Sequence, residues 1–170
     1  HLPDAARTKD LWRTEAAREG LDLYLCRVES HDARRPELLS GFDAAVEFAP
    51  SLVRYQRPRE HSQCRLSRLL RGQAHDTHGS YTAPNGDIVI DYEDIVNHMC
   101  SFSSFYEYKI YPGVMPNWDN SPRFVAGARI LHNSSRESYY LWLSKTVEEF
   151  RPYSADEDML FMTVWNDWAD

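Results

Sequence analysis

The chain of 170 residues is 42% hydrophobic and 13% aromatic, which is enough apolar content for a globular domain and excludes a disordered or collagen-like chain. Its 19 basic and 26 acidic residues give a net charge of −7, and the arginines are scattered, so we expect no nucleic-acid partner. No apolar stretch reaches the roughly 20 residues that cross a bilayer, so we expect a soluble domain with no transmembrane segment.

The three cysteines are far apart in the sequence and have no C-x-x-C spacing, which argues against a disulfide framework and a structural zinc site. Residues 75–78, "HDTH", lack a third spaced ligand, so we expect neither a metal ion nor another cofactor. A reducing cytoplasm is therefore the expected location. These observations set no oligomeric state.

The first part of the chain predicts one helix and two strands. Apolar spacing predicts a helix over residues 8–20, with Thr8 as its cap and Gly20 as its end. Residues 21–29 and 42–48 are dense in strand-favouring apolar residues, and we expect both to form buried strands.

Residues 49–90 are broken by prolines and glycines and are predicted to be a long excursion with one short helix over residues 64–71. Apolar residues at helical spacing predict another helix over residues 91–102. An apolar run that starts at Tyr108 predicts the third strand.

The last two expected elements are a helix over residues 136–150, about four turns long, and a strand over residues 159–165 that is buried on both sides. Helices that alternate with continuous apolar strands favour parallel strands joined by crossover helices. No glycine-rich phosphate motif is present, so a closed barrel is favoured over an open doubly wound sheet.

A complete (β/α)8 barrel needs about 250 residues, whereas this chain has four convincing strands. We therefore expect an α/β fold in which residues 1–170 are a single domain, the C-terminal half of a TIM-type barrel. Its first and last strands would then expose unpaired edges, so we expect the isolated segment to aggregate or dimerise.

Acidic residues follow the apolar run of each predicted strand. In a parallel barrel all these strand ends lie on the face that carries the active site. Any one acid could equally be solvated or cap the next helix, but the full set predicts a single acidic cleft. The set comprises Glu29, Glu47, Asp119, Asp167 and Asp170.

Tryptophans lie beside the last two acidic clusters. Trp118 and Trp168 are suited to packing on the C–H faces of a sugar, while nearby carboxylates and amides bind its hydroxyl groups. Trp165 lies inside the predicted strand and is expected to be a core residue. An acidic, aromatic cleft of this kind predicts a sugar or oligosaccharide as the substrate.

Four segments carry a resemblance to a known family: "GFDAAVEFAPS", "YPGVMPNWDNSPR", "YYLWLSKTVEEF" and "MTVWNDWAD". In this order they resemble the WbsX-like glycosyltransferases, whose domain is related to glycoside hydrolase family 99. The resemblance spans most of the chain. It implies a (β/α)8 barrel that acts on sugars in the biosynthesis of bacterial surface polysaccharide (O-antigen).

The closing motif of that family usually runs W-N-E-W-x-E, and the resemblance places its two glutamates at Asp167 and Asp170. In the related hydrolases this pair cleaves α-mannosides with retention through a 1,2-anhydro sugar, one carboxylate acting as base at the 2-hydroxyl and the other as acid and base. Here aspartate replaces both glutamates, which withdraws each carboxylate by about 1.5 Å and puts efficient glycosidase chemistry in doubt.

Three hypotheses follow from these observations. The first is a glycosyltransferase, with Asp167 and Asp170 as catalytic residues and a nucleotide-sugar as the donor. The second is a retaining glycosidase that acts on α-mannoside-like bonds with the same pair. The third is a catalytically weak sugar-binding domain. The substrate-binding residues in all three are Glu47, Trp118, Asp119, Asn120, Arg123, Asn166 and Trp168.

Overall fold

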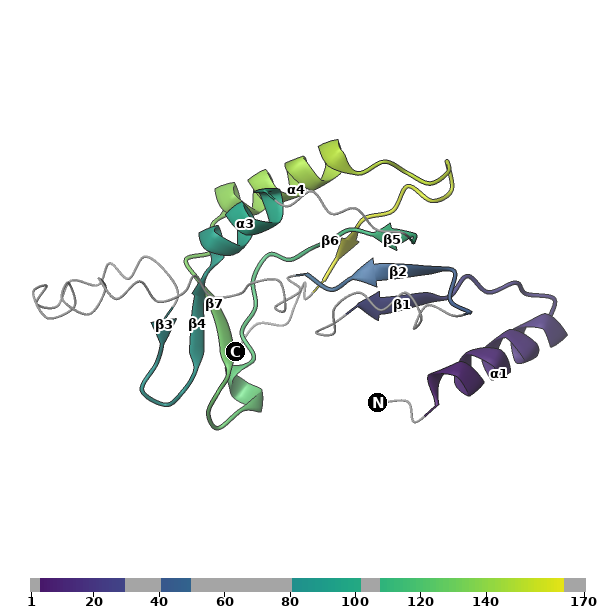
Figure 1. Ribbon diagram of the computed structural model, residues 1–170, viewed down its shortest axis with the longest axis horizontal. Coiled ribbons are helices and arrows are strands. Elements are labelled where there is room, and N and C mark those ends of the chain that lie inside the picture. The colour runs from purple at the N-terminus through teal and green to yellow at the C-terminus, as the bar shows by residue number, and fades with distance from the viewer. Residues whose placement is uncertain (1–3, 30–40, 50–80, 102–107, 164–170) are drawn as a thin grey trace, which may run out of the picture.

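The computed structural model describes residues 4–29, 41–49, 81–101 and 108–163, which form a mixed α/β structure (Figure 1). In this view the described strands lie below the helices α3 (Tyr92–Ser101) and α4 (Arg136–Glu149), and α1 (Ala5–Arg18) lies at the opposite end of the molecule from the strands β3, β4 and β7. None of the described helices is long and apolar enough to cross a membrane.

Four stretches of chain form a run of parallel strands. β1 (Cys26–Glu29), β2 (Ala44–Glu47) and β5 (Ile110–Tyr111) pair in that order, and β6 (Gly113–Val114) pairs with β8 (Phe161–Met162). Only Pro112 separates β5 from β6, and its carbonyl oxygen accepts a hydrogen bond from the Phe161 N–H at 3.0 Å. The predicted parallel strands are therefore present, in sequence order.

The burial of these strands differs from the prediction at both edges. β2 is buried as expected, but Val28 in β1 is 57% exposed and Met162 in β8 is 41% exposed. Each of these two strands lies at an edge of its sheet among the described residues, and the side chains of a parallel strand are buried only where other elements cover both faces of the sheet. The expectation of buried strands there was wrong.

A second sheet lies within and beyond the stretch predicted to be an excursion. β3 (Tyr81–Thr82) pairs antiparallel with β4 (Ile88–Asp91), and β4 pairs parallel with β7 (Arg129–His132). The prediction of an excursion up to residue 90 was therefore wrong for residues 81–90. Gly86, at φ +88°, makes the tight turn between β3 and β4, because glycine adopts positive φ without steric cost.

The long helices confirm the predictions made from apolar spacing. α3 (Tyr92–Ser101) starts directly after β4, and α4 (Arg136–Glu149) is capped by the Ser135 hydroxyl, which accepts from the Ser138 N–H at 3.0 Å. α1 (Ala5–Arg18) is also present, but its cap is Asp4, whose carboxylate accepts from the Arg7 N–H at 2.8 Å. Thr8 was therefore the wrong cap. The helix predicted over residues 64–71 lies outside the described residues.

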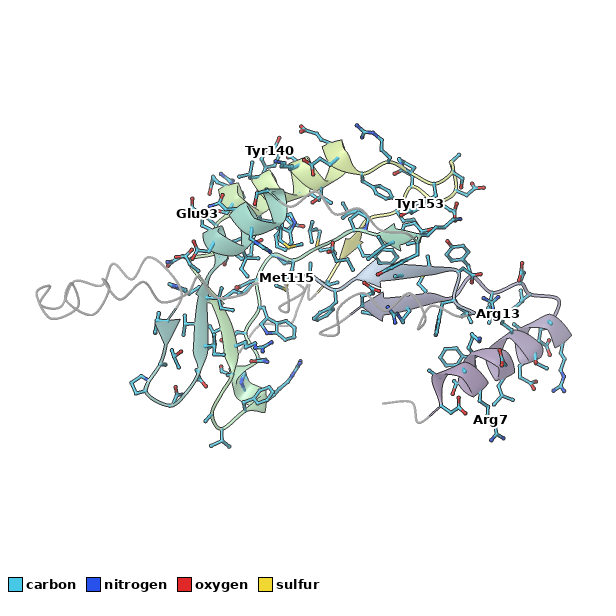
Figure 2. All side chains as sticks on the ribbon, viewed as in Figure 1. Arg7, Arg13, Glu93, Met115, Tyr140 and Tyr153 are labelled. Atoms are coloured by element: carbon cyan, nitrogen blue, oxygen red, sulfur yellow. The ribbon has the colours of Figure 1, made fainter. Side chains whose placement is uncertain are left out.

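The main core lies between the strands and the pair α3 and α4. Figure 2 shows Met115 in the centre of the molecule below α3, where it is fully buried. The Tyr92 hydroxyl donates to its carbonyl oxygen at 2.6 Å, which ties the start of α3 to the end of β6. The other buried members of this cluster are Ala49, Ile90, Ile95, Val96, Val114, Leu131 and Trp142.

A smaller apolar cluster covers one face of the β1, β2 and β5 sheet. Ala44, Val46 and Tyr111 are its buried members, and the segment after α4 packs on it through Phe150 and Phe161. Since successive side chains of a strand point to opposite faces, the other face carries the intervening residues, which are polar at Arg27, Glu29 and Glu47.

The described strands form three small sheets and no closed barrel. The expectation of half a TIM-type barrel therefore stays a prediction, as does the aggregation expected from its exposed edges.

Candidate functional site

The carboxyl ends of β1 and β2 place two glutamates side by side. Glu29 and Glu47 are register partners in this parallel pair, so their side chains lie on the same face of adjacent strands, about 4.8 Å apart at the backbone. Oε2 of Glu47 lies 3.5 Å from the N–H of Gly113, at the start of β6. The predicted gathering of acids at strand ends is therefore present for this pair.

Glu29 is held by two partners on the polar face of the sheet. Its carboxylate is in close contact with the guanidinium of Arg27, and Oε1 accepts from the Tyr108 hydroxyl at 2.7 Å. Tyr108 lies just before β5, so its side chain reaches Glu29 across β2, where Ala45 is fully buried and has only a methyl side chain. Only 17% of the Arg27 side chain and 10% of the Glu29 side chain are exposed.

Thr163 joins the carboxyl ends of the other strands. Its N–H donates to the carbonyl oxygen of Val114 at 2.9 Å, and its hydroxyl lies 3.3 Å from the carbonyl oxygen of Ala49. These contacts bring together the segments that follow β2, β6 and β8. We call this the strand-end rim, defined by Glu29, Glu47, Ala49, Asn117, Trp118 and Thr163.

Trp118 follows β6 and packs at the rim. Its ring meets the ring of Phe48 edge to face, with centroids 5.9 Å apart, and its carbonyl oxygen accepts from the Leu131 N–H at 2.8 Å. Its indole Nε1 is buried without a hydrogen-bond partner among the described residues, as is Oδ1 of the preceding residue, Asn117.

The predicted residues after Trp118 lie in a turn that leads to the second sheet. Oδ1 of Asp119 accepts from the Ser121 N–H at 2.7 Å, and Oδ1 of Asn120 accepts from the Arg129 N–H at 2.6 Å. Arg123 ends the short 3₁₀ helix η2 (Ser121–Arg123) and is exposed. Asp119 and Asn120 thus hold the backbone that enters β7, an arrangement that the sequence motif did not indicate.

The other predicted site residues lie outside the described residues: Asn166, Asp167, Trp168 and Asp170. The described chain stops at Thr163, four residues before Asp167 in the sequence. Within the described ranges no group of three or more His, Cys, Asp or Glu side chains could hold a metal ion.

A second polar cluster lies where β4 and β7 end. Asp91 and His132 are register partners, and the Asp91 carboxylate accepts from the Glu93 N–H at 3.0 Å and from the Asn133 side-chain amide at 3.1 Å. His132 Nε2 lies 3.8 Å from Asp91. This cluster fixes the start of α3 and the end of β7, and it was missed because β4 and β7 were not predicted.

Sequence reasoning also missed Arg27, Tyr108 and Asn117. Glu29 was recognised as an acid at a strand end, and the alternation of side chains along β1 would have placed Arg27 on the same face. No pattern in the sequence indicates that Tyr108 reaches across β2, because that contact depends on the pairing of three strands.

Comparisons with known proteins agree with the motifs. Residues 1–170 match the family described as Glycosyltransferase WbsX. A protein named uncharacterized protein WxcX, from two strains of Xanthomonas campestris pv. campestris, is 30% identical over 171 aligned positions in each strain. The alignment covers 99% of this chain and 22% of the relative, so the chain spans about a fifth of the length of these proteins. No solved structure matches. The chain belongs to the WbsX glycosyltransferase family.

Proposed function

We propose that this chain forms part of a carbohydrate-active enzyme that transfers a sugar from a nucleotide-sugar donor during assembly of bacterial surface polysaccharide. The observation that supports the proposal is the strand-end rim, where Glu47 ends β2 next to the start of β6 and the Trp118 ring packs on Phe48, the residue after Glu47. In barrel enzymes this is the side on which catalysis takes place. Membership of the WbsX glycosyltransferase family supports the same reaction class.

The rim has the chemistry that a sugar requires. Glu47 supplies carboxylate oxygens that accept from hydroxyl groups, and the Trp118 indole, which packs on the following residue Phe48, offers an apolar ring. We further propose that Asn166, Trp168 and the catalytic pair Asp167 and Asp170 complete the rim in the complete protein. The parallel strands would then belong to a (β/α)8 barrel.

Asp119, Asn120 and Arg123 have a smaller part in this proposal. Asp119 and Asn120 already bind backbone N–H groups in the turn, so they would act on the substrate chiefly by holding Trp118 in place. Arg123 is exposed on η2, where its guanidinium is suited to a phosphate of the donor.

A second candidate is a retaining glycosidase that acts on α-mannoside-like bonds, and the equivalence of Asp167 and Asp170 to the paired glutamates of the related hydrolases favours it. The shorter side chains argue against it, because a misplacement of about 1 Å in a catalytic group can cost about 100-fold in rate. If neither activity occurs, the rim would act as a sugar-binding site.

The complete protein should be assayed with nucleotide-sugars plus acceptors and with aryl glycosides, as the wild type and as Asp167→Asn and Asp170→Asn. Asp156→Asn is the matched control, because Asp156 is an exposed acid in the loop after α4. We expect nucleotide release that depends on the acceptor in the wild type and in the control. In Asp167→Asn and Asp170→Asn, which we call the rim variants, this release should fall at least 100-fold.

Each outcome separates the candidates. Hydrolysis of aryl glycosides without transfer would favour the glycosidase. Sugar binding without turnover, unchanged by either rim substitution, would leave only the binding function. Transfer that persists in both rim variants would contradict the assignment of the catalytic pair.

A further inference from the structure

Two adjacent residues at the rim each hold a buried polar atom with no hydrogen-bond partner among the described residues. These atoms are Oδ1 of Asn117, an acceptor, and Nε1 of Trp118, a donor. Buried polar side-chain atoms are nearly always paired in folded proteins, so each exception requires an explanation. A role in ligand binding is one such explanation.

The surrounding contacts fix Trp118, and the backbone next to Asn117, in place. The carbonyl oxygen of Trp118 accepts from the Leu131 N–H at 2.8 Å, and its ring packs edge to face on Phe48. The two unpaired atoms are therefore not left over from a poorly packed loop. They lie on a segment that is anchored to β2 on one side and to β7 on the other.

The two atoms are complementary to a hydroxyl group, which is a donor and an acceptor at once. We propose that Asn117 Oδ1 and Trp118 Nε1 together bind one hydroxyl group of the sugar, which makes Asn117 a specificity-determining residue of the site. This inference rests on the proposed function and adds a contact that the sequence motifs did not identify.

The chemistry of the pair selects a neutral group. A phosphate or carboxylate oxygen could accept from Trp118 but would be repelled by the carbonyl oxygen of Asn117, which is also an acceptor. Only the polar atoms are shielded, since both side chains are partly exposed as a whole. A sugar hydroxyl therefore reaches the two atoms only when both side chains shift, because both atoms are shielded from solvent.

The first test concerns stability. Asn117→Leu removes an unpaired polar atom and nearly conserves shape, so we expect a melting temperature of the complete protein equal to or above that of the wild type. Trp118→Phe also removes ring volume that packs on Phe48 and the core, so it serves only in the binding test. Removing a buried group that lacks a partner loses no hydrogen bond. Tyr139→Phe is the matched control, because the Tyr139 hydroxyl on α4 is also buried without a partner among the described residues but Tyr139 is not one of the residues that define the rim.

The second test concerns specificity. Titration calorimetry of the complete protein with methyl hexopyranosides and their monodeoxy analogues should find one hydroxyl whose removal weakens binding about tenfold, the effect of one good hydrogen bond. Asn117→Leu and Trp118→Phe should each abolish this preference, while Tyr139→Phe keeps it.

The outcomes distinguish this inference from the proposed function. A clear drop in melting temperature for Asn117→Leu would mean that its Oδ1 is bonded within the protein, which overturns the inference. Sugar binding with an unchanged preference in both variants would overturn it while leaving the proposed function intact. If no sugar of the panel binds the wild type, the inference fails, and the proposed function is decided separately by the transfer assay.

Discussion

The carbonyl oxygen of Glu47 lies 2.2 Å from the point at which a Cβ atom would extend from Gly113. This close approach lets the Gly113 N–H face the Glu47 carboxylate, and it requires that residue 113 has no side chain. The position of Glu47 at the rim therefore depends on a glycine at the start of β6.

Gly113→Ala should push the two strands apart, because the atom it would meet is backbone and cannot rotate away. We expect a loss of about 2 kcal/mol in the free energy of unfolding, typical of overpacking in a filled interior, measured by urea denaturation. Gly20→Ala is the control. Gly20 has open space around its Cβ position and only its positive φ opposes alanine, so a cost of about 1 kcal/mol is expected there. Equal costs at the two sites would contradict the steric account.

Asp43 joins α1 to the sheet. Its Oδ2 accepts from Arg13 at 2.7 Å and from the Leu25 N–H at 2.6 Å, and Figure 2 shows Arg13 on α1, next to the strands. Asp43→Ala should cost about 2 kcal/mol, since hydrogen bonds to a charged group are the stronger kind. Asp22→Ala, at an exposed aspartate in the same region, should change the unfolding free energy by less than about 0.5 kcal/mol. A comparable loss in both variants would refute a specific role for Asp43.

The same contact makes stability depend on pH. Burial alone would raise the pKa of Asp43, but the Leu25 N–H and the Arg13 guanidinium outweigh it and lower the pKa below 3.8. A lowered folded-state pKa stabilises the protein above the unfolded value and ceases to do so as the pH falls below it. The difference in stability between wild type and Asp43→Ala should therefore shrink below about pH 4 and stay constant between pH 6 and 8.

Glu157 joins the loop after α4 to the amino ends of the strands. Hydrogen bonds from Lys109 at 2.6 Å and from the Tyr24 hydroxyl at 2.8 Å lower the pKa of Glu157 from 4.5 to about 2. Its contribution should be complete above pH 4.5 and disappear as the pH falls towards 2. Thermal melts of wild type and Glu157→Gln should differ most at neutral pH and converge near pH 2. Curves that stay parallel across this range would rule out an ionised Glu157 as the source of the difference.

Asn133 takes up a left-handed backbone conformation at φ +56° while its side-chain amide donates to Asp91 at 3.1 Å. Asn133→Gly keeps the conformation and loses the hydrogen bond, whereas Asn133→Ala loses the hydrogen bond and also strains the backbone. Alanine should therefore cost about 1 kcal/mol more than glycine in the free energy of unfolding. The opposite order would show that the backbone at this residue is not under constraint.

Apolar periodicity predicted the long helices and the parallel strands because both depend on local spacing and on burial against neighbours. It failed at β4 and β7, since "DIVID" is a short run inside a proline- and glycine-rich stretch and "RILH" is four residues long. These two runs pair although they are about 40 residues apart in the chain, and the spacing of residues within each run does not indicate this pairing.

The candidate site was predictable to the same degree. Glu47 and Trp118 were named as candidates because acids and aromatic residues that follow apolar runs are visible in the sequence alone. The hydrogen bonds of Asp119 and Asn120 to the turn, and the reach of Tyr108 to Glu29, depend on strand register and on the second sheet. Neither of these can be read from the spacing of residue types.

The central claim is that Glu47, Trp118, Asp167 and Asp170 lie on one side of a run of parallel strands and contact the same sugar. A crystal structure of the complete protein with a bound saccharide tests it most directly. We expect the saccharide to contact Glu47, Trp118 and at least one of the two aspartates. A saccharide bound away from the rim, or aspartates at the amino ends of the strands, would contradict the account.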